Sequence, residues 1–146
     1  MITLKDVNVN NFEECLTLDV NDNQHAFVAP NLRSLAQAYV YREVARPFAL
    51  YNADSMVGFA MLAVDCEEKE YWLWRFMIDK HHQNKGYGKE AMRAILAYFL
   101  SIGAKVVKLS FEPENQIAKK LYQSLGFYEN GEMEEDEIVM QLDMPI

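Results

Sequence analysis

The residue pattern best suited to chemistry in this sequence is a glycine-containing turn at 83–89, Gln-Asn-Lys-Gly-Tyr-Gly-Lys. It follows an apolar run at 71–78, typical of a buried strand, and precedes residues 90–100, whose apolar positions have helical spacing. A turn between a strand and a helix directs several backbone N–H groups at one point, at the positive end of the helix dipole. We therefore predict a cradle that holds a pyrophosphate without a metal ion.

The glycines and lysines of this turn would act in different ways. Gly86 and Gly88 lack a Cβ, so the chain can adopt unusual dihedral angles and a ligand can approach the backbone closely. Lys85 and Lys89 add positive charge beside it. The turn has neither the three glycines of a dinucleotide-binding fingerprint nor the Gly-Lys-Ser/Thr of a P-loop. A short Gly-x-Gly taken alone also fits an ordinary turn before a helix.

Two blocks of the sequence together resemble the GNAT N-acetyltransferase superfamily. The turn matches its acetyl-CoA loop, Gln/Arg-x-x-Gly-x-Gly/Ala, at Gln83, Gly86 and Gly88. Downstream, residues 115–127 are similar to the second signature, Asn-x-x-Ala-x-x-x-Tyr followed by Gly-Phe. The resemblance implies a single acetyltransferase domain over residues 1–146, with acetyl-CoA as the cosubstrate.

The order of the predicted elements agrees with that fold. Strands are expected at 2–7, 47–53, 56–65, 70–79, 106–111, 127–132 and 138–144. Helices are expected at about 11–18, 32–44 with Asn31 as its cap, 86–102 and 115–125. The resemblance implies an α/β (α+β three-layer) fold, in which a mixed, mostly antiparallel sheet of about six to seven strands is flanked by about four helices. Two central strands, 71–79 and 106–111, would be splayed apart to admit acetyl-CoA.

The resemblance also implies the set of residues that contact the cofactor. The pantetheine arm would bind along the unpaired edge of the first splayed strand, through backbone groups that need partners. The residues expected to contact acetyl-CoA are Phe76, Met77, Ile78, Gln83, Asn84, Lys85, Gly86, Tyr87, Gly88, Lys89, Asn115 and Lys119. By residue type alone, Asn115 would also cap the helix that follows it.

Tyr122 is the candidate general acid. GNAT enzymes often use a tyrosine at this position, and its hydroxyl would protonate the CoA thiolate as that group leaves. The alternative interpretation is a helical tyrosine whose ring packs while its hydroxyl is solvated.

The general base is less well defined. An amine with a pKa near 10.4 is protonated at pH 7, and freeing its lone pair costs about 4–5 kcal/mol. Several GNAT enzymes, polyamine acetyltransferases among them, carry an acid at the position corresponding to Trp74, and a tryptophan cannot accept a proton. Glu112 is the nearest alternative, with Glu70 and Asp79 behind it. A solvated surface acid is the ordinary interpretation of each.

The acceptor amine is expected opposite the cofactor, beside the loop or broken helix at 19–30. The residues that could line its site are Asp22, Gln24, His25, Phe27, Trp72 and Trp74. Residues 24–29 and 75–79 resemble the spermine/spermidine acetyltransferase branch of the superfamily. A formal net charge of −8 suits a polycationic acceptor and argues against a nucleic-acid partner. Other small amines, aminoglycosides and a protein N-terminus or lysine stay open, as does an acyl-CoA-binding regulatory module without turnover.

Composition limits the remaining possibilities. A hydrophobic content of 51% excludes disorder, no apolar stretch approaches the ~20 residues that cross a bilayer, and the N-terminus lacks a signal-peptide core. The two cysteines and the pair His81–His82 offer no metal-ligand spacing. We therefore expect a cytoplasmic, metal-free enzyme that does not bind membranes. The resemblance implies a homodimer, because GNAT domains of this size are commonly homodimers. The acidic run 132–137 is expected to be an exposed turn.

Overall fold

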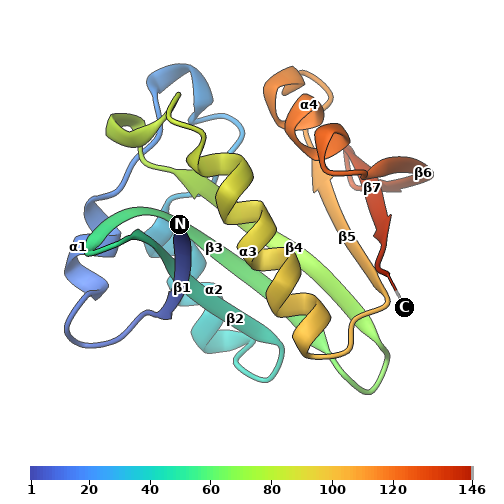
Figure 1. Ribbon diagram of the computed structural model, residues 1–146, viewed down its shortest axis with the longest axis horizontal. Coiled ribbons are helices and arrows are strands. Elements are labelled where there is room, and N and C mark those ends of the chain that lie inside the picture. The colour runs from blue at the N-terminus through green and yellow to red at the C-terminus, as the bar shows by residue number, and fades with distance from the viewer. Residues whose placement is uncertain (146) are drawn as a thin grey trace.

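The computed structural model describes residues 1–145, which form one mixed sheet with helices packed against it (Figure 1). The strands are β1 (Ile2–Asp6), β2 (Ala45–Asn52), β3 (Ser55–Asp65), β4 (Glu70–Ile78), β5 (Val106–Phe111), β6 (Tyr128–Glu134) and β7 (Glu137–Asp143). The helices are α1 (Phe12–Thr17), α2 (Asn31–Val40), α3 (Tyr87–Ser101) and α4 (Gln116–Ser124), with 3₁₀ turns at Asp22–Gln24 and Lys80–His82. The predicted fold class is confirmed.

The sheet contains seven strands in the order β1-β2-β3-β4-β5-β7-β6, and only β4 and β5 pair in parallel. A parallel pair needs a crossover connection, which α3 provides. The two strands pair only where Trp72 and Leu73 meet Lys108 and Leu109, and they diverge beyond those residues. The predicted splay of the two central strands is therefore confirmed, and Figure 1 shows β5, β7 and α4 standing apart from β4 and α3.

Each face of the sheet has its own core. On one face, α3 crosses the sheet (Figure 1) and packs Met92, Ile95 and Phe99 against β4. That spacing places the three side chains on one side of the helix, as the sequence pattern predicted. On the other face, α1 and α2 cover β2 and β3 around Phe59 and Met61. Burial of both faces leaves the end of the β4–β5 gap as the place where a ligand can enter.

A β-bulge in β4 breaks the alternation of side chains beside this gap. Met61 and Leu62 of β3 pair with Arg75 and Leu73, so Trp74 is the extra residue. A bulge re-aims the side chains next to it. As a result, residues three apart share a face: Trp74 and Met77 pack with the core that α1 and α2 cover, whereas Leu73 and Phe76 pack with the core under α3.

The start of α2 differs from the prediction. Asn31 is the first residue of the helix and Pro30 takes the cap position, while the buried Asn31 amide donates to the Cys15 carbonyl over 2.9 Å. The helix ends at Val40, and β2 begins at Ala45 and includes Pro47. Proline is tolerated at this position because β1 pairs only with Phe48–Asn52, so the missing N–H has no strand to bond.

Candidate functional site

A cavity of about 630 Å³ lies where β4 and β5 diverge. Among the predicted site residues, those that line it are Gln24, His25, Phe27, Trp74, Phe76, Met77, Ile78, Gln83, Asn84, Gly86, Tyr87, Gly88, Glu112, Asn115 and Tyr122. The fold thus brings candidates for cofactor binding, acceptor binding and catalysis into one space. Those placed outside the lining are Asp22, Trp72, Lys85, Lys89 and Lys119. Of these, Lys119 makes an ion pair of 3.3 Å with Glu129 of β6.

The first turn of α3 has the geometry of an anion cradle. Gly86 precedes the helix with φ +83°, and Asn84 also has a positive φ of 63°. The first helical hydrogen bond runs from the Glu90 N–H to the Gly86 carbonyl over 3.3 Å. The N–H groups of Tyr87 and Gly88 precede that bond, so they have no partner within the helix and are available to an anion.

Only one of the two glycines in this turn is required by its backbone. Gly86 has the left-handed conformation that disfavours other residues. Gly88 lies inside the helix, and a Cβ built on it would meet Leu121 Cδ2 at 3.8 Å, an ordinary contact. A need for glycine at position 88 would therefore come from the ligand rather than from the protein.

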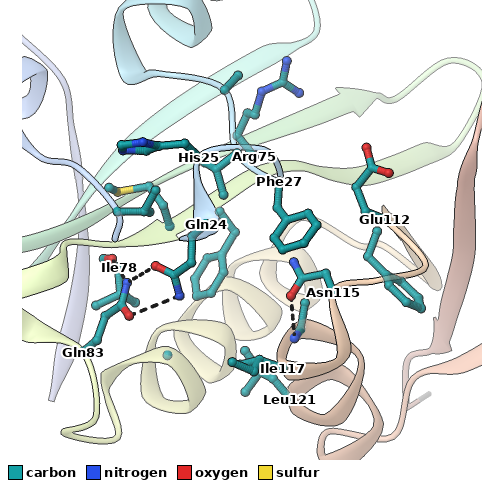
Figure 2. A pocket seen from close by; sticks show the side chains of 18 of the residues that line it. Gln24, His25, Phe27, Arg75, Ile78, Gln83, Glu112, Asn115, Ile117 and Leu121 are labelled. Atoms are coloured by element: carbon teal, nitrogen blue, oxygen red, sulfur yellow. Dashed lines mark hydrogen bonds between the residues drawn. The ribbon is translucent and has the colours of Figure 1, made fainter. Parts of the chain in front are cut away.

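The side chain of Gln83 is fully used within the protein. Its Nε2 donates to the Ile78 carbonyl and to Gln24 Oε1, both over 2.9 Å (Figure 2). Its Oε1 accepts from Asn21 Nδ2 and from Gln24 Nε2 at 3.1 and 3.3 Å. An amide has two donors and two acceptor positions, so a phosphate contact by Gln83 would have to use its backbone N–H. The side chain instead joins the cradle to the segment at 21–24.

Asp79, a reserve candidate for the base, holds the chain just before that segment in place. Its carboxylate is 5% exposed and accepts hydrogen bonds from the backbone N–H groups of Asp19 and His81 at 2.9 and 3.1 Å. Glu70, the other reserve candidate, lies at the far end of β4, where it accepts from Trp72 Nε1 over 3.3 Å. Neither carboxylate lines the cavity.

Tyr122 is placed on α4 with its side chain 8% exposed and its ring packed near Phe127. Burial raises the pKa of its phenol, and the negative charge of Glu137 raises this pKa further. The hydroxyl therefore stays protonated around neutral pH and can serve as a proton donor toward the cavity.

Asn115 positions this helix. Its Oδ1 accepts a hydrogen bond from the Ala118 N–H over 3.3 Å, so the predicted cap is confirmed. Figure 2 shows Asn115 at the start of α4, facing the cavity beside Ile117. Since α4 carries Tyr122, the cap also fixes where the phenol lies.

Replacing Asn115 by alanine is expected to lower the free energy of unfolding by about 1 kcal/mol, because the helix loses its capping acceptor. Asn115→Asp is the matched control, since an aspartate keeps an oxygen at this position and should retain most of the stability. Urea denaturation followed by circular dichroism measures both variants. An alanine variant as stable as the wild type would show that the cap contributes nothing.

Carboxylates line the side of the cavity away from Gln83. Glu112 follows β5 and is half-buried, and its pKa is raised by burial and by the charges of Glu137, Glu114 and Asp136. Figure 2 shows the Phe27 ring between Gln24 and Glu112. Glu137 also lines the cavity, although the acidic run that contains it was predicted to be an exposed turn. That prediction was wrong for Glu137, because the turn is confined to Glu135–Asp136 and β7 begins at Glu137.

Two arginines and a tryptophan form the wall beside α2. Arg75 donates to Gln37 Oε1 over 2.9 Å and to the Trp74 carbonyl over 3.1 Å. Within the described residues its buried Nε has no hydrogen-bond partner. The Trp74 ring meets Tyr41 edge-on at a centroid separation of 5.7 Å, and Arg33 of α2 also lines the cavity. Neither arginine was among the predicted site residues, because only α2 and the bulge in β4 bring them to this wall.

Within residues 1–145, no three His, Cys, Asp or Glu side chains gather closely enough to hold a metal ion. No helix of this part of the chain combines the length and apolarity needed to cross a membrane.

Comparison with known proteins assigns the family. A family model described as "Acetyltransferase (GNAT) family" matches residues 12–127. The probable spermine N(1)-acetyltransferase of Bacillus subtilis subsp. natto (strain BEST195) is 33% identical over 143 residues, which is 91% of each chain. The spermine/spermidine N(1)-acetyltransferase of Bacillus subtilis (strain 168) is 32% identical and covers 91% of each chain. The crystal structure of spermidine N-acetyltransferase from Vibrio cholerae, in complex with CoA and spermine, has a TM-score of 0.76 at 20% identity and covers 96% of this chain and 92% of that one.

The splayed parallel strands, with an anion cradle at the start of α3, define an acyl-CoA-dependent transferase. The chain belongs to the GNAT acetyltransferase family. It is therefore an enzyme that transfers an acetyl group to an amine, and acetyl-CoA is its cosubstrate. The cavity fits that cosubstrate. The N–H groups of Tyr87 and Gly88 can bind its pyrophosphate, and the unpaired edge of β4 can bind its extended pantetheine arm.

Proposed function

We propose that the acceptor is a primary amine of a small polycation, a polyamine such as spermidine or spermine, which attacks acetyl-CoA directly in a ternary complex. The observation that carries this proposal is that Glu112 and Glu137 line the same cavity as the cradle and Tyr122. Two carboxylates within one partly enclosed space attract a cation more strongly than they would in water. The names of the two relatives that are 33% and 32% identical support the same acceptor class.

The residues divide into a donor side and an acceptor side. On the donor side, backbone N–H groups of 86–88 would hold the pyrophosphate, the edge of β4 from Phe76 to Ile78 would bind the pantetheine arm, and Asn115 would contact that arm. Lys85, Lys89 and Lys119 would act only on parts of acetyl-CoA that extend outside the cavity, since they do not line it. Tyr122 would protonate the departing thiolate.

On the acceptor side, Gln24, His25, Phe27 and Trp74 would surround the amine. Apolar walls lower the pKa of a buried amine, because desolvation disfavours its charged form. Phe27 and Trp74 would therefore increase the neutral, nucleophilic fraction. The Asp22 side chain is fully exposed and Trp72 lies outside the cavity, so they would contact only the distal part of a long acceptor.

The acceptor is tested by measuring CoA release with spermidine, spermine, a simple monoamine, an aminoglycoside and a peptide with a free N-terminus. We expect kcat/KM for the polyamines to exceed that for the monoamine by about fivefold, since an extra ammonium group near carboxylates gains roughly 1 kcal/mol. Equal efficiency with the monoamine would remove the polyamine assignment. Preference for the peptide or the aminoglycoside would replace it, and calorimetric binding of acetyl-CoA without turnover on any amine would indicate a regulatory binding module.

The assembly and location of the enzyme belong to this proposal. We propose one catalytic domain that works as a homodimer in the cytoplasm. β6 lies at the edge of the sheet and exposes 44% of Tyr128 and 58% of Met133, which suits pairing with a second copy. Sedimentation equilibrium would show a single monomeric species if this surface is free in solution.

A further inference from the structure

We propose that Glu137, the first residue of β7, is the catalytic residue that takes the proton from the ammonium group of the acceptor, directly or through one water. This inference rests on acetylation of an amine in this cavity and not on which amine is used. β4 carries Trp74, which cannot accept a proton, at the position where several GNAT enzymes carry an acid. Glu137 would supply the missing carboxylate from β7.

The strand register places Glu137 at the open end of the splay. Ser110 pairs with Val139 and Phe111 with Ile138, so Glu137 lies one residue beyond the last pair of β5 and β7. The chain leaves β5 for Glu112 at the same end of the sheet. Glu137 consequently lines the cavity that the α3 cradle and Tyr122 also line.

The carboxylate of Glu137 is held in a fixed orientation. Ser110 Oγ donates to Glu137 Oε1 over 2.8 Å. Among residues 1–145, no donor is bonded to Glu137 Oε2, so this oxygen can accept a proton or a water hydrogen bond. The side chain of Glu112 has no such hydrogen bond within the same range, although it lines the same cavity. A group held at the site before the reaction needs less reorganisation when the proton moves.

Charged and titratable groups interact with Glu137 from several elements around it. They are Arg75 of β4, Glu112 after β5, Tyr122 of α4 and Glu134, its cross-strand partner in β6. Arg33, His25 and His82 also line the cavity. Arg75 attracts the carboxylate, and the neighbouring acids Glu112 and Glu134 repel it.

The position of Glu137 also couples the two proton transfers. Burial raises the pKa of Tyr122, and the Glu137 charge raises it further. When Glu137 accepts the proton of the ammonium group, its charge disappears and the second contribution is lost. Tyr122 then becomes a stronger acid at the stage when the CoA thiolate needs a proton.

The proposed acetyl transfer accounts for every proton and electron pair. The ammonium group gives one proton to Glu137, and the freed lone pair forms the N–C bond to the thioester carbonyl. The C–S bond breaks, its electron pair leaves on sulfur, and the sulfur takes the proton of Tyr122. The nitrogen then loses a second proton, through water, to the tyrosinate. Glu137 releases its proton to solvent, so both residues return to their starting states.

Glu137→Gln tests this role with two monoamines, a strongly basic alkylamine and a weakly basic fluorinated alkylamine that is already neutral at pH 7. We expect kcat to fall about 10²–10⁴-fold with the basic amine, the range for loss of a general base, and less than about tenfold with the neutral one. The glutamine keeps the acceptor for Ser110, so calorimetric affinity for acetyl-CoA and the far-ultraviolet circular dichroism should be unchanged. Raising the pH should restore the rate with the basic amine as its neutral fraction grows.

Glu112→Gln is the matched control, because it removes an equivalent charge from the same cavity. It should cost about tenfold or less with both amines. Ser110→Ala is the second variant: it keeps the carboxylate but frees it to rotate, so it should lower kcat with the basic amine only, by less than Glu137→Gln does.

Three results with the variants would overturn the role of Glu137. An equal loss with both amines makes Glu137 a structural or binding residue, and wild-type turnover of Glu137→Gln removes it from the mechanism. An amine-dependent loss in Glu112→Gln instead assigns the base to Glu112. A wild type that acetylates no amine refutes amine acetylation and Glu137 together, whereas one that acetylates a monoamine as well as spermidine refutes only the polyamine assignment.

Discussion

Tyr122→Phe is expected to lower kcat by about 10²–10⁴-fold, the range for loss of a general acid, without changing the affinity for acetyl-CoA. The phenylalanine ring keeps the packing against Phe127, whose ring centroid lies 5.9 Å from that of Tyr122. Only the hydroxyl is lost, and the CoA thiolate then leaves without a proton. Because the interaction is made only as the bond breaks, the loss should appear in kcat and kcat/KM equally.

Single-turnover kinetics with saturating acetyl-CoA measure this effect on the chemical step. Tyr128→Phe is the matched control, because that hydroxyl donates to Asp143 over 2.9 Å on the exposed face of the β6–β7 hairpin. It should leave kcat unchanged. A Tyr122→Phe variant with wild-type single-turnover rate would reduce Tyr122 to a packing residue.

Gly86→Val is expected to weaken acetyl-CoA binding by about 10–100-fold. Gly86 has φ +83°, and no atom lies within 4 Å of a Cβ built there, so the cost comes from the backbone alone. A β-branched residue in this conformation is strained by about 1–3 kcal/mol. Relief of that strain would turn the N–H groups of Tyr87 and Gly88 away from the pyrophosphate.

Gly131→Val separates lost binding from general strain. Gly131 of β6 has φ +87° and equally open surroundings, and it does not line the cavity. Isothermal titration calorimetry should show normal acetyl-CoA affinity for this control, while thermal unfolding shows a similar loss of stability in both variants. Unchanged affinity in Gly86→Val, or an equal loss in Gly131→Val, would contradict the cradle.

The parts of the fold with strong local signals could be predicted from the sequence. β5 begins and ends at the predicted residues, because the apolar residues of Val106–Phe111 recur at alternate positions between a glycine turn and charged residues. α3 lies within one residue of its predicted limits at each end, since glycines stand at both ends and the apolar spacing is regular. The splay and the cradle followed from the family resemblance together with these elements.

The features that the sequence did not predict depend on how the strands and turns pair in the folded chain. Trp74 is the extra residue of a bulge that only the β3–β4 pairing reveals. Glu137 belongs to an acidic run whose composition indicates solvation, and only the β5–β7 register brings one member into the cavity. Asp22 was predicted beside the acceptor because its neighbours are there, but the 3₁₀ turn at Asp22–Gln24 directs its side chain into solvent.

The amide pair between Gln24 and Gln83 sets a limit on how acceptor preference can be redesigned. Gln24 lines the cavity on the acceptor side, yet its side chain and that of Asn21 complete the hydrogen bonds of the turn that precedes the cradle. Substituting them for a new acceptor would disturb the donor half of the enzyme. Residues 25–29 line the cavity without bonding to Gln83, so they are the positions where natural variation or engineering can change the acceptor while the donor site stays intact.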